Sequence, residues 1–178
     1  MRKKGIAMTS ETAPDILKGK WVLIVDDEED VLDVLIQLLD MCRVDRASTF
    51  EEAKKLLEKN PYDIAVLDIM EVRGYDLLKI ADRRNIPAVM LTAHALTKAD
   101  VIRSIQEGAS FFAPKDRITD IANFLAGVLE ARQINANTWA RWFESLGDFY
   151  DKRFGGTDWR DREREFWEEK LRDWDNKL

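Results

Sequence analysis

Five residues with reactive or metal-binding side chains each stand directly after a short apolar segment. They are Asp26 and Asp27 after residues 21–25, Asp68 after residues 63–67, Thr92 after residues 86–91 and Lys115 after residues 109–114. Short apolar segments rich in β-branched residues are typical of strands that are buried on both faces of a parallel sheet. Because all strands of a parallel sheet end at one edge, we expect three carboxylates, a hydroxyl and an ammonium group to converge there.

This group of side chains predicts phosphoryl transfer assisted by a metal ion. Three neighbouring carboxylates repel one another, and a divalent cation relieves that repulsion. Oxygen ligands suit Mg²⁺, whereas a chain with one histidine and one cysteine offers no zinc-type cluster. One carboxylate can then attack a phosphoryl donor that the ammonium and hydroxyl groups position. Taken alone, Asp26 and Asp27 are equally consistent with a solvated helix start, where acidic residues are favoured.

The segments between the predicted strands carry apolar residues at helical spacing. Examples are Val31, Val34, Leu35 and Leu38 after the first strand, and Ile121, Phe124, Leu125 and Val128 after the last. Thr97 is placed to cap the helix that contains Val101 and Ile105. Five strand candidates alternate with five helix candidates. This alternation predicts a doubly wound α/β domain with a parallel sheet and right-handed crossovers.

Five short motifs follow one another along residues 20–133. They are Val22 to Glu28 with its acidic pair, Ala65 to Asp68, Val89 to Ala93, Gly108 to Phe112, and Lys115. In this order they resemble the receiver domain of bacterial two-component response regulators. The resemblance covers about two thirds of the chain and implies a flavodoxin-like, CheY-like fold. In that fold a five-stranded parallel sheet has the strand order 2-1-3-4-5, with helices on both faces.

The resemblance also implies how a phosphoryl group is received. Asp68 would be the phosphoacceptor, and the donor would be a sensor histidine kinase or a phosphotransfer protein. Besides Asp68, the ligands of Mg²⁺ would be Asp27 directly, Asp26 mostly through water, and the backbone carbonyl of Met70. Such a protein catalyses only its own phosphorylation and dephosphorylation, so we do not expect an enzyme that turns over a separate substrate.

Three further residues have roles that the resemblance implies. Lys115 would pair with Asp68 and later with a phosphoryl oxygen. Thr92 would turn its hydroxyl towards the phosphoryl group, and Phe112 would swing into the vacated space as the switch aromatic. The residue pattern alone is also consistent with Phe112 as an ordinary core side chain.

The sequence departs from the family pattern in three places. Asp116 follows Lys115 where the family usually has proline, and we expect a trans bond there because a non-proline cis bond costs about 3 kcal/mol. The loop after Asp68 is short and lacks its common proline. His94 stands two residues after Thr92, where the family tunes access of the hydrolytic water; a solvent-facing loop histidine is the alternative interpretation. These departures bear on the lifetime of the aspartyl phosphate.

The flanking segments differ from the domain in composition. Residues 1–19 are small and polar and predict a flexible leader. Residues 134–178 hold five of the six tryptophans and predict an aromatic helical hairpin that is broken at Gly155 and Gly156. So short a hairpin needs a surface to pack on, either the receiver domain or a second copy of the chain. Packing on the face of the last strand could be released by phosphorylation, and packing on a copy would form a homodimer.

Composition and tail chemistry leave several functions open. A net charge of −6, no long apolar segment and a single cysteine favour a cytoplasmic protein that does not enter membranes. The first hypothesis is a switch of contacts with an unknown downstream protein. The second is a transcription regulator with an atypical helical DNA-binding tail, although glutamates interleave with the tail arginines. The third hypothesis is a degenerate receiver that acts as a constitutive interaction module. The fourth is an enzyme of the same fold.

Overall fold

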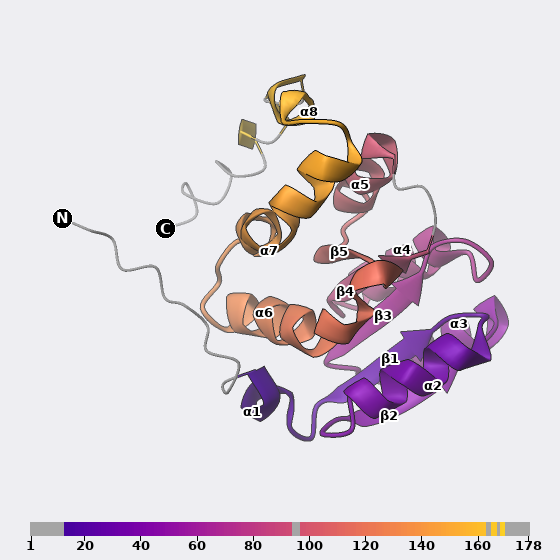
Figure 1. Ribbon diagram of the computed structural model, residues 1–178. Helices are drawn as coiled ribbons and strands as arrows, with labels where there is room; N and C mark the ends of the chain where they lie inside the picture. The colour runs from indigo at the N-terminus through magenta and orange to yellow at the C-terminus, as the bar shows by residue number, and fades with distance from the viewer. Residues whose placement is uncertain (1–12, 94–96, 163–164, 167, 170–178) are drawn as a thin grey trace.

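The computed structural model describes residues 13–93, 97–162, 165–166 and 168–169 (Figure 1). Its centre is a five-stranded parallel sheet in the order β2-β1-β3-β4-β5, so the predicted fold class and strand order are confirmed. The strands are β1 (Trp21–Val25), β2 (Arg43–Ala47), β3 (Ile64–Asp68), β4 (Ala88–Thr92) and β5 (Phe111–Pro114).

Helices connect the strands and extend beyond the last one. They are α1 (Ala13–Leu17), α2 (Glu29–Leu38), α3 (Phe50–Lys59), α4 (Gly74–Arg83), α5 (Lys98–Gln106), the 3₁₀ helix η1 (Lys115–Asp120), α6 (Ile121–Gln133), α7 (Thr138–Arg153) and α8 (Asp158–Arg162). Helices α2 and α6 cover one face of the sheet, and α3, α4 and α5 cover the other (Figure 1). This two-sided cover explains why every residue of β3 and β4 is buried.

Local sequence signals account for several element boundaries. The Thr97 hydroxyl accepts a hydrogen bond from Asp100 N–H, and the Asp100 carboxylate accepts one from Thr97 N–H, which forms a capping box at the start of α5. The predicted cap is therefore confirmed. Thr49 caps α3 by accepting from the backbone N–H of Glu52.

Helix α1 lies within residues 1–19, which were predicted to form a flexible leader. Residues 1–12 lie outside the described residues, but α1 packs against α6 and the Leu17 side chain is fully buried. The backbone carbonyl of Leu17 accepts hydrogen bonds from Lys20 N–H at 2.9 Å and from Cys42 Sγ at 3.4 Å. A single buried leucine in a polar segment gives no periodic pattern, so the sequence did not indicate this helix.

The C-terminal extension is helical and folds back onto the domain. Helix α7 contacts both α6 and the edge strand β5, and α8 follows after the turn at Gly155 and Gly156 (Figure 1). The face of α7 that meets the domain is aromatic and apolar: Trp139, Trp142, Leu146 and Tyr150 are buried. The predicted hairpin residues Trp167, Leu171 and Trp174 lie outside the described residues. No helix in the described part of the chain is long and apolar enough to cross a bilayer.

Candidate functional site

The carboxyl ends of four parallel strands bring the predicted site residues to one edge of the sheet. Asp26 directly follows β1, Asp68 ends β3, Thr92 ends β4, and Lys115 directly follows β5. The strand register keeps these ends side by side. The convergence expected from the sequence therefore follows from the strand order and from equal strand lengths across the centre of the sheet.

Lys115 lies at the centre of the site and contacts three carboxylates. Its Nζ is 2.7 Å from Asp26 Oδ2, 2.9 Å from Glu28 Oε1 and 3.3 Å from Asp68 Oδ1. The side chains of Asp26 and Asp68 are only 1% and 5% exposed, and that of Lys115 is 12% exposed. Water screens these charges weakly, so one ammonium group holds two buried carboxylates together. The sequence predicted a pair with Asp68, and the structure adds a closer contact with Asp26.

Backbone amides orient the two buried carboxylates. The N–H of Glu28 donates to Asp26 Oδ1 at 3.0 Å, and the N–H of Met70 donates to Asp68 Oδ2 at 3.2 Å. In each carboxylate the second oxygen then faces Lys115. Each acid thus holds one oxygen in a fixed place and offers the other to a cation.

Glu28 is a site residue to which the sequence analysis gave no role. It belongs to the acidic motif after β1, and its position two residues after Asp26 lets its backbone and side chain contact the site together. Its side chain is 56% exposed, so solvent screens its contact with Lys115. The signal that could have indicated it is the uninterrupted acidic run from Asp26, which we interpreted only as part of the motif.

The charges at the site shift the pKa values of its members. Burial raises the pKa of Asp26 above its ordinary value, although Lys115 and the Glu28 amide work in the opposite direction. Burial also raises the pKa of Asp68; Lys115 opposes this effect, and the charge of Asp26 adds to it. Burial works against the charged form of Lys115, but its contacts with Asp26 and Glu28 outweigh burial and raise its pKa. Both buried carboxylates therefore lack part of the positive charge that they need.

A divalent cation fits this donor set. One carboxylate oxygen from each of Asp26, Asp27 and Asp68 lies within 4.8 Å of the other two. Ligands of an octahedral Mg²⁺ at about 2.1 Å lie roughly 3–4 Å apart, so a small inward movement completes the geometry. Asp27 is exposed, which leaves room for the water ligands that Mg²⁺ retains. Burial raises the pKa values of the two buried acids, so a bound cation would stabilise their charged forms.

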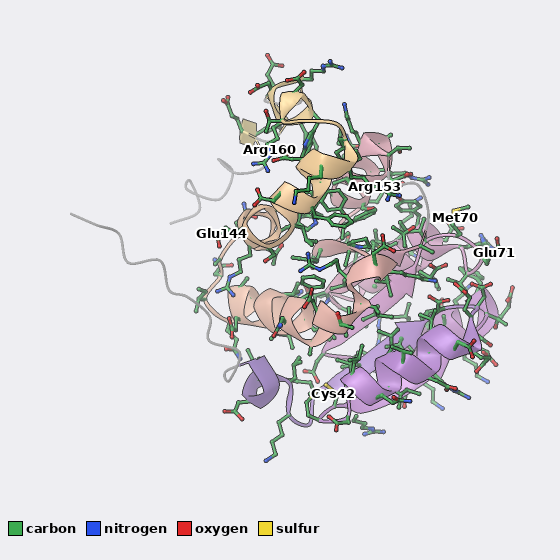
Figure 2. The ribbon with its side chains drawn as sticks, viewed as in Figure 1. Cys42, Met70, Glu71, Glu144, Arg153 and Arg160 are labelled. Carbon is green, nitrogen blue, oxygen red and sulfur yellow. The ribbon has the colours of Figure 1, made fainter. Side chains whose placement is uncertain are left out.

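The loop after β3 presents Met70 to solvent and places α4 close to Asp68. The Met70 side chain is 66% exposed, and it lies beside Glu71 at the tip of this loop (Figure 2). Its carbonyl accepts a hydrogen bond from Arg73 N–H at 3.0 Å and keeps a second lone pair for a cation. Arg73 is left-handed at φ 54°, and a Cβ on Gly74 would fall on the Asp68 carbonyl oxygen. The short loop therefore requires glycine at position 74.

Thr92 and Phe112 are both buried, on the adjacent strands β4 and β5. Thr92 is 5% exposed, and Phe112 is fully buried. Phe112 lies on β5, three residues before Lys115, which directly follows this strand. Its ring centroid is 6.5 Å from that of Tyr150 in α7, and its carbonyl accepts a hydrogen bond from Trp142 Nε1 at 2.7 Å. This contact with the C-terminal helix is a finding that the sequence did not indicate.

The departures from the family pattern are accommodated locally. Peptide bonds are trans throughout the described residues, including the one between Lys115 and Asp116. Pro114 closes β5, and the chain then turns into η1, whose Arg117 binds Asp120 at 2.6 Å. His94 lies outside the described residues.

Comparisons with known proteins match about two thirds of the chain, and the family match ends within α6. The profile described as the response regulator receiver domain matches residues 22–125. The heme response regulator HssR of Staphylococcus aureus (strain Newman) is 31% identical over 122 residues. That alignment covers 65% of this chain and 54% of HssR, so the chain spans about half the length of this relative.

Solved receiver structures show the same fold. The CheY-like response regulator receiver domain protein from Methanospirillum hungatei JF-1 is 25% identical, with a TM-score of 0.54 over 64% of this chain and 98% of that chain. The Francisella response regulator 1452 receiver domain is 25% identical, with a TM-score of 0.52 over 61% of this chain and 97% of that chain. The profile spans the strand ends that carry Asp26, Asp68, Thr92 and Lys115. Because sequence, strand order and site agree over this segment, the chain belongs to the response regulator receiver domain family of two-component systems.

Proposed function

We propose that this chain receives a phosphoryl group on Asp68 and passes the change on through protein contacts. The observation that carries the proposal is the ion network in which Lys115 bridges Asp26 and Asp68 at the carboxyl edge of the sheet. The Asp68 carboxylate is positioned by a backbone amide, adjoins a fixed cation and lies within 4.8 Å of two further carboxylates. This arrangement has the nucleophile, the charge neutralisation and the metal ligands that phosphoryl transfer requires.

The proposed metal ligands are those that membership of the receiver family implies, and the grouping of Asp26, Asp27 and Asp68 supports them. Asp27, Asp68 and the Met70 carbonyl would bind Mg²⁺ directly, and Asp26 would act mostly through water. Bound Mg²⁺ would neutralise the oxygens of the incoming phosphoryl group. Lys115 would then be free to leave Asp26 and to follow the new negative charge on Asp68.

The transfer itself is a displacement at phosphorus. An oxygen of the Asp68 carboxylate forms a bond to the phosphorus of a phosphohistidine, the P–N bond breaks, and the imidazole keeps the electron pair and takes up a proton. Lys115 binds one phosphoryl oxygen, and the Thr92 hydroxyl donates to another. The donor is a sensor histidine kinase or a phosphotransfer protein in the cytoplasm. The chain changes its own covalent state and turns over no separate substrate.

The output is a change in protein contacts. In the tail, Arg160 donates to both carboxylate oxygens of Asp151, at 2.8 and 2.7 Å, beside α7 (Figure 2). An arginine used in this way inside the extension does not favour the alternative of DNA binding.

The aromatic face of α7 is buried against the chain's own sheet edge, so pairing of two copies would have to use other surfaces.

Intact-mass analysis with acetyl phosphate as the donor tests the proposal. With Mg²⁺, the natural protein should gain the mass of one phosphoryl group, and the Asp68→Asn variant should gain none. Omission of Mg²⁺ should abolish the gain. A folded natural protein that stays unmodified, or an equal gain in the Asp68→Asn variant, would contradict the proposal and favour a degenerate receiver.

A further inference from the structure

Helix α7 seals the open edge of the sheet. Strand β5 stands at the end of the strand order, and no strand among the described residues pairs with its outer side, yet all four of its residues are buried. Helix α7 lies along this edge, between α5 and α6 (Figure 1). The Trp142 indole N–H donates to the Phe112 carbonyl at 2.7 Å. A side chain of the tail thus binds the backbone of the edge strand directly.

The contact is made of stacked aromatic rings around Phe112. Trp142 and Tyr150 are fully buried, and their rings stack with centroids 4.8 Å apart. Tyr150 also faces Phe112, and Trp159 of α8 meets Trp142 edge-on at 6.3 Å. Phe112, which has the proposed switch role, is therefore a residue that the tail contacts.

The docked arrangement carries one unfavourable feature. Within the part of the chain that the structure describes, the buried Tyr150 hydroxyl has no hydrogen-bond partner. Burial raises the pKa of this hydroxyl well above its usual range, which keeps it neutral. An unpaired buried hydroxyl disfavours the docked state by about five- to a hundredfold. The tail is held by ring packing, by the Trp142 hydrogen bond to Phe112, and by the ion pair of Arg141 with Glu130 of α6 at 2.8 Å. The unpaired Tyr150 hydroxyl opposes this docking.

The same strand connects this contact to the charged site. Lys115 follows β5 directly, and it contacts Asp26 and Glu28 more closely than Asp68. Phosphorylation of Asp68 moves negative charge towards Asp68, and Lys115 must follow it. Phe112 lies three residues before Lys115, and its ring and carbonyl contact α7, so a displacement of Lys115 would act close to the docking contact.

We propose that residues 138–162 form an intramolecular clamp on β5 that loosens when Asp68 is phosphorylated. This inference rests on the proposed function, because it requires the phosphoryl group. Coupling between two sites is reciprocal, so a looser clamp also makes phosphorylation of Asp68 easier. Trp142 and Tyr150 act on the site through Phe112 and are positioning residues for it.

Hydrogen exchange measured by mass spectrometry on the full chain tests the clamp. The amides of α7 and β5 are followed with Mg²⁺, before and after treatment with acetyl phosphate, and intact mass is recorded on the same samples. Phosphorylation should speed exchange of the α7 amides about tenfold, while exchange in β1 and β3 stays unchanged. Absence of the phosphoryl mass overturns the proposed function. A phosphoryl mass with unchanged α7 exchange overturns the clamp alone.

Two variants with opposite expected effects sharpen the test. Trp142→Phe keeps an aromatic ring but deletes the donor to Phe112, so it should loosen α7 and speed phosphorylation by acetyl phosphate several-fold. Tyr150→Phe deletes the unpaired hydroxyl, so it should tighten α7 and slow phosphorylation. If Trp142→Phe does not fold, Tyr150→Phe decides alone. Altered α7 exchange without any change in phosphorylation rate would mean that these residues only pack, and would overturn the coupling.

Discussion

Replacement of Lys115 by methionine should destabilise the protein strongly in the absence of Mg²⁺. Methionine keeps the length of the side chain and removes its charge. At an effective dielectric constant of about 20, an ammonium group at 2.7 Å from Asp26 and 3.3 Å from Asp68 is attracted by about 6 and 5 kcal/mol. The loss is offset because the variant no longer dehydrates an ammonium group and because its carboxylates can take up protons.

The net cost should resemble that of breaking other buried ion pairs, about 3–5 kcal/mol. For a chain of 178 residues this corresponds to a fall in Tm of roughly 6–20 °C. The contact with half-exposed Glu28 adds little to this figure because solvent screens it. The matched control is Lys55→Met, which removes an exposed lysine from α3 and should change Tm little.

Thermal unfolding of both variants, with and without Mg²⁺, is the assay. Mg²⁺ supplies the positive charge that Lys115→Met lacks, so it should raise the Tm of this variant more than that of the natural protein. Acidification should also raise the Tm of Lys115→Met relative to the natural protein, because protons neutralise Asp26 and Asp68. The reasoning is refuted if Lys115→Met is as stable as the natural protein without Mg²⁺, or if Mg²⁺ stabilises both equally.

Three further predictions concern the charges and the backbone at the site. Without Mg²⁺ and at about pH 7, Asp68→Asn should be more stable than the natural protein, because burial raises the pKa of Asp68 and its charged form therefore disfavours the folded state. Denaturation at a series of pH values should show that the stability difference between Asp68→Asn and the natural protein shrinks as the pH falls through the raised pKa of Asp68. A difference that grows on acidification would contradict the prediction. Asp27→Asn should weaken Mg²⁺ binding at least about tenfold in calorimetric titration, whereas Asp30→Asn in α2 should not. Gly74→Ala should lower the free energy of unfolding by about 2–3 kcal/mol because its Cβ meets the Asp68 carbonyl. The control Gly127→Ala in α6 should raise the free energy of unfolding by about 0.5–1 kcal/mol, since the nearest atom that its Cβ would meet, in Arg141, is 3.9 Å away. Equal effects of the two substitutions would show that the contact at position 74 is relaxed.

The central strands and their ends could be predicted because each is a buried apolar segment followed by a polar residue. Parallel order brings those ends together without further information, which is why Asp26, Asp68, Thr92 and Lys115 meet as expected. Strand β2 gave a weaker signal, because it lies at the sheet edge and carries Arg43 and Arg46. Edge strands are often charged, and such a segment has no clear alternation.

Contacts between distant elements could not be predicted in the same way. The apolar stripe of α7 predicted that the helix is buried on one side but not that Trp142 meets the carbonyl of Phe112. An apolar stripe on a helix shows that this face must be buried, but many partner surfaces could bury it. The closer contact of Lys115 with Asp26 than with Asp68 has a similar origin, since it depends on differences of a few tenths of an ångström.

Chemical mapping of the modified residue can identify the phosphoacceptor directly. After treatment with acetyl phosphate and Mg²⁺, borohydride reduction converts an aspartyl phosphate to homoserine, and tryptic peptides then locate it. The peptide of residues 60–73 contains two aspartates, Asp63 and Asp68, so it carries its own internal control. Homoserine at position 68, with Asp63 intact, is the predicted result. Homoserine at Asp26 or Asp27 instead, or its absence from a folded protein, would contradict the assignment of Asp68 as the acceptor.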